Sequence, residues 1–148
     1  MKRLFLLALL ALGVSACAHK TGTINNESRV SSENVFYSPD FDKHPEIEFK
    51  RNGEALKQSI ATIWYADNTS LGLGKRLDKN GPVRFIGIAL SSVSMLDEPK
   101  RSQAVDDIFR SIINHVSNLN EFAYVIIKYE MRSDHGNVVR SEKKFELN

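Results

Sequence analysis

The chain has 148 residues, with 20 lysines and arginines against 18 aspartates and glutamates, and a single cysteine. Two of the cations, Lys2 and Arg3, lie in the first sixteen residues, so the remainder carries 18 charges of each sign. This balance argues against the strongly basic surface that nucleic-acid binding requires, and one cysteine excludes an intrachain disulfide. The length remaining after residue 16, about 130 residues, is enough for one domain with one core.

The N-terminus has the order of a secretory signal peptide. Lys2 and Arg3 precede an apolar run from Leu4 to Leu12, and small residues lead from there to Cys17. The run is shorter than the roughly 20 apolar residues of a membrane span. An ordinary signal peptide cleaved near Ala16 and an uncleaved helical anchor are the alternatives.

The segment Val14-Ser15-Ala16-Cys17 resembles the lipobox of bacterial lipoproteins, with Val14 where leucine is usual. The resemblance covers the export segment alone. It implies that residues 1–16 form a cleaved signal peptide, that the thiol of Cys17 is diacylated and that its new amine is acylated. Three acyl chains exceed the two signals that stable anchoring generally needs. Ala18 resembles the residue typical of outer-membrane lipoproteins, so we expect an outer-membrane anchor and a domain that faces the periplasm.

Residues 17–45 are mostly polar and lack a hydrophobic period, which predicts the lipidated cysteine followed by a flexible tether. An apolar island, Val35-Phe36-Tyr37 with Phe41, interrupts this segment. It either packs on the domain as an irregular arm or serves as a short recognition segment for a partner, and the first interpretation is favoured. Residues 46–148 are then expected to form a single domain.

The first part of that domain is predicted to be a β-hairpin. Residues 47–51 alternate, Asn52-Gly53 favours a tight turn, and the β-branched and aromatic run 60–65 favours a strand over residues 54–65. A helix is the alternative for residues 54–65, because their apolar residues also fit helical spacing. Residues 68–81 are predicted to be a loop, and residues 83–93 a strand buried on both faces.

The second part of the domain has clearer signals. Asp97-Glu98-Pro99 predicts a helix start, and apolar residues from Val105 to Leu119 then recur at three- and four-residue steps. Residues 124–132 and 138–147 alternate and predict an antiparallel hairpin with one wet face. The order indicates an α+β domain: a small antiparallel sheet of about four to five strands, with one amphipathic helix packed on one face.

The sequence contains no pattern that identifies an enzyme. The four histidines form no spaced pair, so we expect neither a metal site nor a cofactor. The segment Gly72-Leu73-Gly74-Lys75-Arg76 could cradle an anion but lacks the spacing of a phosphate loop. Trp64 with Tyr65 could form an aromatic platform for a sugar, although strand neighbours would face opposite sides.

These observations favour a non-enzymatic lipoprotein. Acylated Cys17 would bind the bilayer, and the domain would contact an envelope protein as an accessory or scaffold subunit of a secretion, conjugation, pilus or cell-wall assembly. The candidate contact surface comprises Leu73, Lys75, Arg76 and Trp64. The alternative is a lipoprotein that binds a glycan, lipid or peptide, and an enzyme or enzyme inhibitor is a third, weaker hypothesis.

Overall fold

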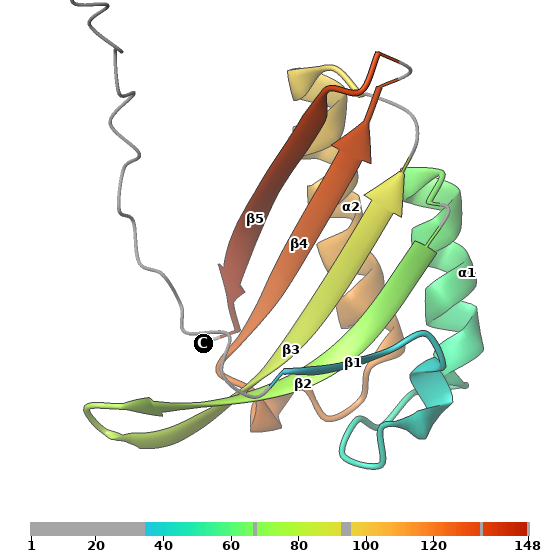
Figure 1. The fold of residues 1–148 in the computed structure, drawn as a ribbon. Helices are drawn as coiled ribbons and strands as arrows, with labels where there is room; N and C mark the ends of the chain where they lie inside the picture. Colours follow the sequence, from blue (N-terminus) through green and yellow to red (C-terminus); the bar gives the residue numbers. More distant parts are fainter. Residues whose placement is uncertain (1–34, 67, 93–95, 134, 148) are drawn as a thin grey trace, which may run out of the picture.

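A computed structural model describes residues 35–66, 68–92, 96–133 and 135–147. It contains a five-stranded sheet with two helices on one face (Figure 1). In chain order the elements are β1 (Phe36–Ser38), the short 3₁₀ helix η1 (Phe41–Lys43), α1 (Gly53–Trp64), β2 (Asn68–Asp78), β3 (Gly81–Ser92), α2 (Glu98–His115), the 3₁₀ helix η2 (Leu119–Glu121), β4 (Tyr124–Arg132) and β5 (Val138–Glu146). The predicted α+β class is confirmed.

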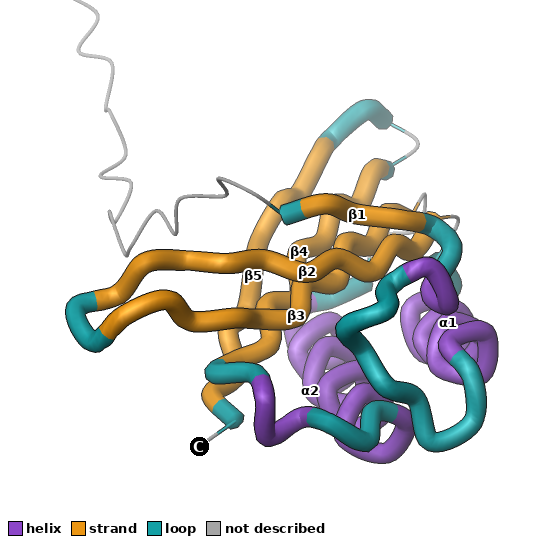
Figure 2. The backbone as a smooth tube through the Cα atoms, turned by 90° about the horizontal axis from the view of Figure 1, so that it is seen from below, coloured by secondary structure: helices purple, strands orange, loops and turns teal. Residues whose placement is uncertain are grey.

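The sheet has the strand order β1-β2-β3-β4-β5 and is mixed rather than purely antiparallel. Strands β3 and β4 pair in parallel, and the other neighbours pair antiparallel. Helix α2 connects the parallel pair, because it carries the chain back to the end at which β3 began. Both helices lie against the same face of the sheet, and the other face has no helix on it (Figure 2).

The main core lies between the helices and the sheet. Leu56, Ile60 and Trp64 recur every four residues along α1 and are buried, and Ile108 and Ile112 do the same on α2. This spacing places each set on one side of its helix. The sheet contributes alternate residues of its central strands to the same core: Ile86, Ile88, Leu90, Val125, Ile127 and Met131.

The strand predicted over residues 54–65 is wrong, because these residues form α1. The Asn52 side chain accepts a hydrogen bond of 2.8 Å from the backbone N–H of Ala55, so Asn52 caps a helix instead of opening a hairpin. The expected partner segment contributes an isolated bridge between Phe49 and Val116. The sheet is therefore covered by a second helix, in addition to the one predicted.

The predicted loop 68–81 is also wrong, because residues 68–78 form β2 and the turn comprises Lys79 and Asn80. The segment was predicted to be a loop because its glycines are more typical of loops than of strands. In the sheet, Tyr37 lies over Gly72 and Phe85 over Gly74, so aromatic rings of neighbouring strands fill the space that absent side chains leave.

The remaining predicted elements are confirmed. Asp97 caps α2 through a 3.1 Å bond from the backbone N–H of Lys100, and β4 and β5 form the expected antiparallel hairpin. Strand β3 is buried on both faces at Phe85 and Ile86. The packed part of the domain includes residues 35–45 of the predicted tether, where β1 joins the sheet and Phe41 enters the core.

Candidate functional site

The most prominent surface feature is a two-stranded arm, residues 75–84, formed by the end of β2 and the start of β3. Strand β1 pairs with β2 as far as Leu73, and β4 pairs with β3 from Phe85 onward. The arm between these limits projects past the rest of the sheet (Figures 1 and 2). Its turn ends at Gly81, whose φ of 116° favours glycine.

The arm combines an exposed apolar tip with positive charge. Leu77 is 80% exposed and lies opposite Pro82 across the two strands. The exposed cations are Lys75 and Arg76 on β2 and Lys79 in the turn. By register, Lys75 and Leu77 share the helix side of the sheet with Leu71 and Leu73, whereas Arg76 lies on the opposite side.

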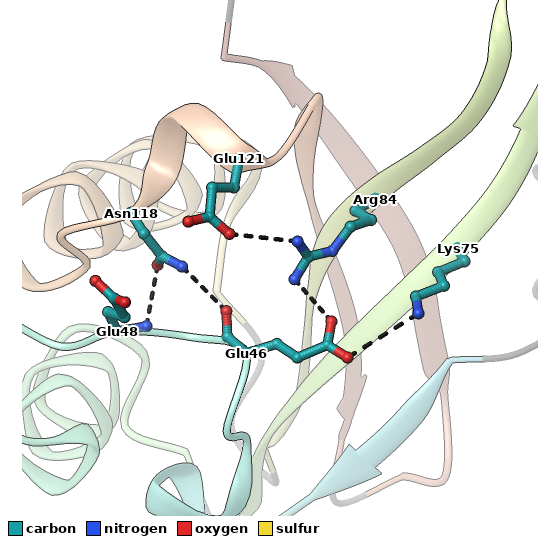
Figure 3. Close-up of polar contacts among 6 residues, drawn as sticks. All are labelled: Glu46, Glu48, Lys75, Arg84, Asn118 and Glu121. Atoms are coloured by element: carbon teal, nitrogen blue, oxygen red, sulfur yellow. Dashed lines mark hydrogen bonds and ion pairs between the residues drawn. The ribbon is translucent and has the colours of Figure 1, made fainter.

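A charged cluster fixes the base of the arm (Figure 3). The Arg84 guanidinium donates to Glu46 at 2.7 Å and to Glu121 at 3.3 Å, and Lys75 lies 4.0 Å from the other oxygen of Glu46. The Asn118 amide donates to the backbone carbonyl of Glu46 at 3.0 Å and accepts from the backbone N–H of Glu48 at 3.0 Å. A cavity of about 420 Å³ lies among these groups.

This cluster ties three segments together: the arm, the chain before α1, and η2. The guanidinium carbon of Arg84 also lies over the Phe122 ring, 5.0 Å from its centre, in a cation–π contact. Glu46 and Glu121 offset the charge of Arg84, and Glu46 also contacts Lys75. The cluster therefore adds polar contacts at the point where the arm leaves the sheet.

A groove lies at the other end of the sheet, between the end of α1 and the start of α2. Its volume is about 470 Å³, and its lining includes Ile63, Tyr65, Pro99, Gln103 and Ala104. Tyr65 is 74% exposed. Strand β2 begins, and strand β3 ends, near the ends of the two helices that line this groove. At their other ends the two strands form the arm, so the two surfaces lie at opposite ends of the molecule (Figure 1).

The backbone of Tyr65 is strained. Its φ of 53° and ψ of 42° place it in the left-handed region, and no other non-glycine residue of the described ranges has a positive φ. This position ends α1, where glycine is the usual residue and a tyrosine costs about 1 kcal/mol or more. Strained backbone conformations cluster at functional sites, so this residue is a candidate for a functional role.

Polar groups surround the groove. The Asp107 carboxylate accepts a 3.0 Å bond from Gln103 and a 2.9 Å bond from Arg110. Near the start of α2, hydrogen bonds from Lys100 lower the pKa of Asp97, in keeping with its role as a helix cap. The groove thus has an apolar floor, an aromatic side chain and a polar rim.

Aromatic and apolar side chains cover one part of the helix-free face of the sheet. Phe85 stacks on Tyr124 at 4.8 Å between ring centres, and Ile126 packs beside them. Burial raises the pKa of Tyr124, and the nearby cations Lys144 and Arg76 oppose that shift. Burial also raises the pKa of Tyr37, with a further contribution from Glu142.

No group of three potential metal ligands gathers among the described residues. Within the same residues, no helix is long and apolar enough to cross a membrane. His115 directs Nδ1 at the backbone oxygen of Ser111, 2.8 Å away, on the flank of α2. His115 therefore makes a local contact within its own helix.

The predicted contact residues have separate positions in the structure. Trp64 is 1% exposed and packs against Tyr129 with 5.1 Å between ring centres, so it belongs to the core and not to a surface. Leu73 is half-buried on the same core. Lys75 and Arg76 lie exposed on the arm. The lipidation site Cys17 lies outside the described residues.

Leu77 escaped the sequence reasoning, and Tyr65 was considered only together with Trp64 as an aromatic platform. Leu77 was hidden by the interpretation of residues 68–81 as a loop, although Asn80-Gly81-Pro82 was a turn signal that could have placed it at a hairpin tip. Tyr65 carries no local signal, because its exposure depends on where α1 ends. No protein-family model, curated protein or solved structure matches this chain.

Proposed function

We propose that this chain is a non-enzymatic lipoprotein, anchored in the outer membrane through acylated Cys17, whose periplasmic domain binds a protein partner. It would serve as an accessory or scaffold subunit of an envelope assembly, such as a secretion, conjugation, pilus or cell-wall machine. The lipobox-like segment supports the anchor. The observation that supports the binding role is the exposed, strained Tyr65 beside the groove between α1 and α2.

The groove has the chemistry of a protein-binding hot spot. Tyrosine is enriched at such positions because it combines a large apolar area with a hydroxyl that can find a partner. Ile63, Pro99 and Ala104 provide an apolar surface beside it, and Gln103 with Asp107 provides a polar rim. The Tyr65 side chain has only two rotatable χ angles, so ordering it against a partner would cost little conformational entropy.

The proposed mechanism is tethering. A lipid anchor confines the domain to one membrane surface, which raises its effective concentration for a partner in the same membrane. Affinity would come from the apolar groove, and proximity would come from the anchor.

The test is a substitution whose effects on stability and binding have opposite signs. Tyr65→Gly relieves the left-handed strain and should raise the free energy of unfolding by about 1 kcal/mol, measured by urea denaturation. The same change should lower the recovery of a crosslinked partner from intact cells at least tenfold, because a hot-spot side chain contributes about 2 kcal/mol.

The matched control is Ile113→Ala. Ile113 is 41% exposed on α2 but does not line the groove, so its replacement should leave partner recovery unchanged. One dominant set of partners, identified by mass spectrometry and lost in the Tyr65→Gly variant, would support the proposal. Full recovery with Tyr65→Gly would contradict it.

A second candidate function is glycan binding in the same groove. A sugar ring could stack on Tyr65, while Gln103 and Asp107 offer the planar amide and carboxylate groups that bind its hydroxyls. Retention of soluble peptidoglycan fragments by the purified protein, sensitive to Tyr65→Gly, would favour this alternative. A partner recovered without any such retention would favour the scaffold.

A further inference from the structure

We propose that the arm, residues 75–84, binds the anionic surface of the bilayer that holds the lipid anchor. Leu77 would insert at the interface, and the cations around it would contact lipid phosphates. The inference rests on the lipid anchoring proposed above but not on the identity of the protein partner.

The tip of the arm has an apolar residue that the fold does not use. Leu77 is 80% exposed, the highest value among the large exposed apolar side chains of the described residues. Its neighbour across the strands is Pro82, which is also exposed. An apolar side chain at a projecting hairpin tip can enter a membrane interface without any change in the fold, because no packing has to be broken.

The charge around the tip complements an anionic membrane. Residues 75–84 contain four cations, Lys75, Arg76, Lys79 and Arg84, against one acidic residue, Asp78. At the base, Glu46 contacts both Lys75 and Arg84. The cations lie on both faces and in the turn, so they surround Leu77 instead of forming a stripe on one side. Each cation near an anionic leaflet strengthens binding roughly fivefold, and salt weakens the effect.

The direction of β1 shows at which end of the domain the chain that leads from the anchor arrives. Strand β1 runs from Phe36, opposite Leu73, to Ser38, opposite Leu71, so it runs away from the arm. The described chain therefore begins at Val35, beside the base of the arm. Residues 18–34 connect this point to Cys17, and such a length can span at most roughly 60 Å. A connection that starts beside the base of the arm allows the arm to reach the leaflet that holds the anchor.

The base of the arm is held in position. The contacts of Arg84 with Glu46 and Glu121 join the arm to the chain before α1 and to η2 (Figure 3). Because the groove beside Tyr65 lies at the opposite end of the sheet, an arm resting on the membrane would direct the groove away from it. An acidic protein surface is the other partner that these cations could fit.

The experiment places a fluorescent reporter at the tip. The full lipidated protein carrying Leu77→Trp is reconstituted into vesicles of equal parts phosphatidylglycerol and phosphatidylcholine, with brominated acyl chains as quenchers. Trp64 is the single native tryptophan and is 1% exposed, so it is shielded from the quencher. The matched control is Tyr65→Trp, which places an exposed tryptophan at the opposite end.

We expect the tryptophan at position 77 to lose at least half of its fluorescence in anionic vesicles and the one at position 65 to lose little. Adding Lys75→Gln and Arg76→Gln, or using phosphatidylcholine alone, should restore most of the signal at position 77. Flotation of the protein with the vesicles reports the anchor independently. Flotation with equal signals at positions 77 and 65 would overturn the membrane contact while leaving the anchor in place. Quenching that does not depend on the cations or on phosphatidylglycerol would overturn the anionic surface as the binding partner.

Discussion

The glycines of β2 are packed against aromatic rings, and this packing explains residues that looked like a loop. A Cβ atom on Gly74 would lie 2.0 Å from the Phe85 ring, and one on Gly72 would lie 2.8 Å from the backbone oxygen of Phe36. A Cβ on Gly87, the cross-strand partner of Gly72, would lie 3.0 Å from the Tyr37 hydroxyl. These positions therefore require glycine, because neighbouring atoms lie too close to leave room for a Cβ atom.

Gly74→Ala should destabilise the domain by about 1–3 kcal/mol, because the added methyl group collides with Phe85 and overpacks that face of the sheet. Urea denaturation followed by the fluorescence of Trp64 measures the change. In the double variant Gly74→Ala with Phe85→Leu, the cost should be less than the sum of the two single costs, since the smaller side chain relieves the collision. Additive costs would contradict the proposed packing.

The hydroxyl of Tyr37 is buried and has no hydrogen-bond partner in the part of the chain that the structure describes. Tyr37→Phe should therefore change the free energy of unfolding by less than about 1 kcal/mol, and in the stabilising direction, because an unpaired polar group leaves the interior. The ring, which covers Gly72 and Gly87, is retained in this variant.

The same substitution has a pH signature. The pKa of Tyr37 is raised in the folded state, first by burial and then by Glu142, so folding favours the neutral phenol. A raised pKa contributes stability that is present below the unfolded value of about 10 and is lost as the pH rises through the folded value. Tyr37→Phe should flatten the decline in stability above about pH 10, and an unchanged alkaline decline would contradict this account.

At the scale of elements, α2 and the β4–β5 hairpin could be predicted because every local signal agreed. Asp97 with Pro99 marks a helix start, and the apolar period of α2 is unbroken. For residues 53–64 the signals conflicted. Asn52-Gly53 suits a hairpin turn and a helix N-cap equally, and tertiary packing of Leu56 and Ile60 on the sheet decided between them.

The candidate surfaces were harder to predict than the elements. The cations Lys75 and Arg76 were identified from their position between glycines, and the structure places both on the arm. Trp64 was misplaced because residues 60–65 were read as a strand. Neighbouring strand residues face opposite sides of a sheet, and nothing in the sequence showed whether Trp64 or Tyr65 would be the buried one. In the helix, the spacing from Ile60 directs Trp64 to the core and leaves Tyr65 at the left-handed cap.

At the scale of the whole molecule, two surfaces with different chemistry lie at opposite ends of one sheet. The arm is cationic with an apolar tip, and the groove is apolar with an aromatic side chain and a polar rim. Strands β2 and β3 connect them rigidly, because they pair over eleven residue positions. A domain of this kind can bind a membrane at one end and present a protein-binding surface at the other, without a conformational change between the two.

This separation predicts that the arm can be shortened without loss of the fold. Residues 76–83 pair only with one another in the sheet, and their contact with the buried side chains is that of Val83 with the cluster around Phe85. Replacing them by Asn-Gly between Lys75 and Arg84 should therefore lower the free energy of unfolding by only about 1–2 kcal/mol. The Arg84 contacts with Glu46 and Glu121 remain available to the shortened chain. Thermal and urea denaturation of the lipidated protein in detergent measure this expectation.

Shortening the arm and replacing Tyr65 should therefore have different effects on partner recovery. In detergent, where there is no bilayer to orient the domain, the shortened variant should recover the crosslinked partner as well as the native chain does, whereas Tyr65→Gly should not. In vesicles or intact cells, the shortened variant should recover less partner, because the anchor alone restricts the domain's distance from the membrane but not its orientation. Partner loss in detergent on shortening the arm would instead place the protein contact on the arm, and the acidic protein surface would replace the membrane as the best account of its cations.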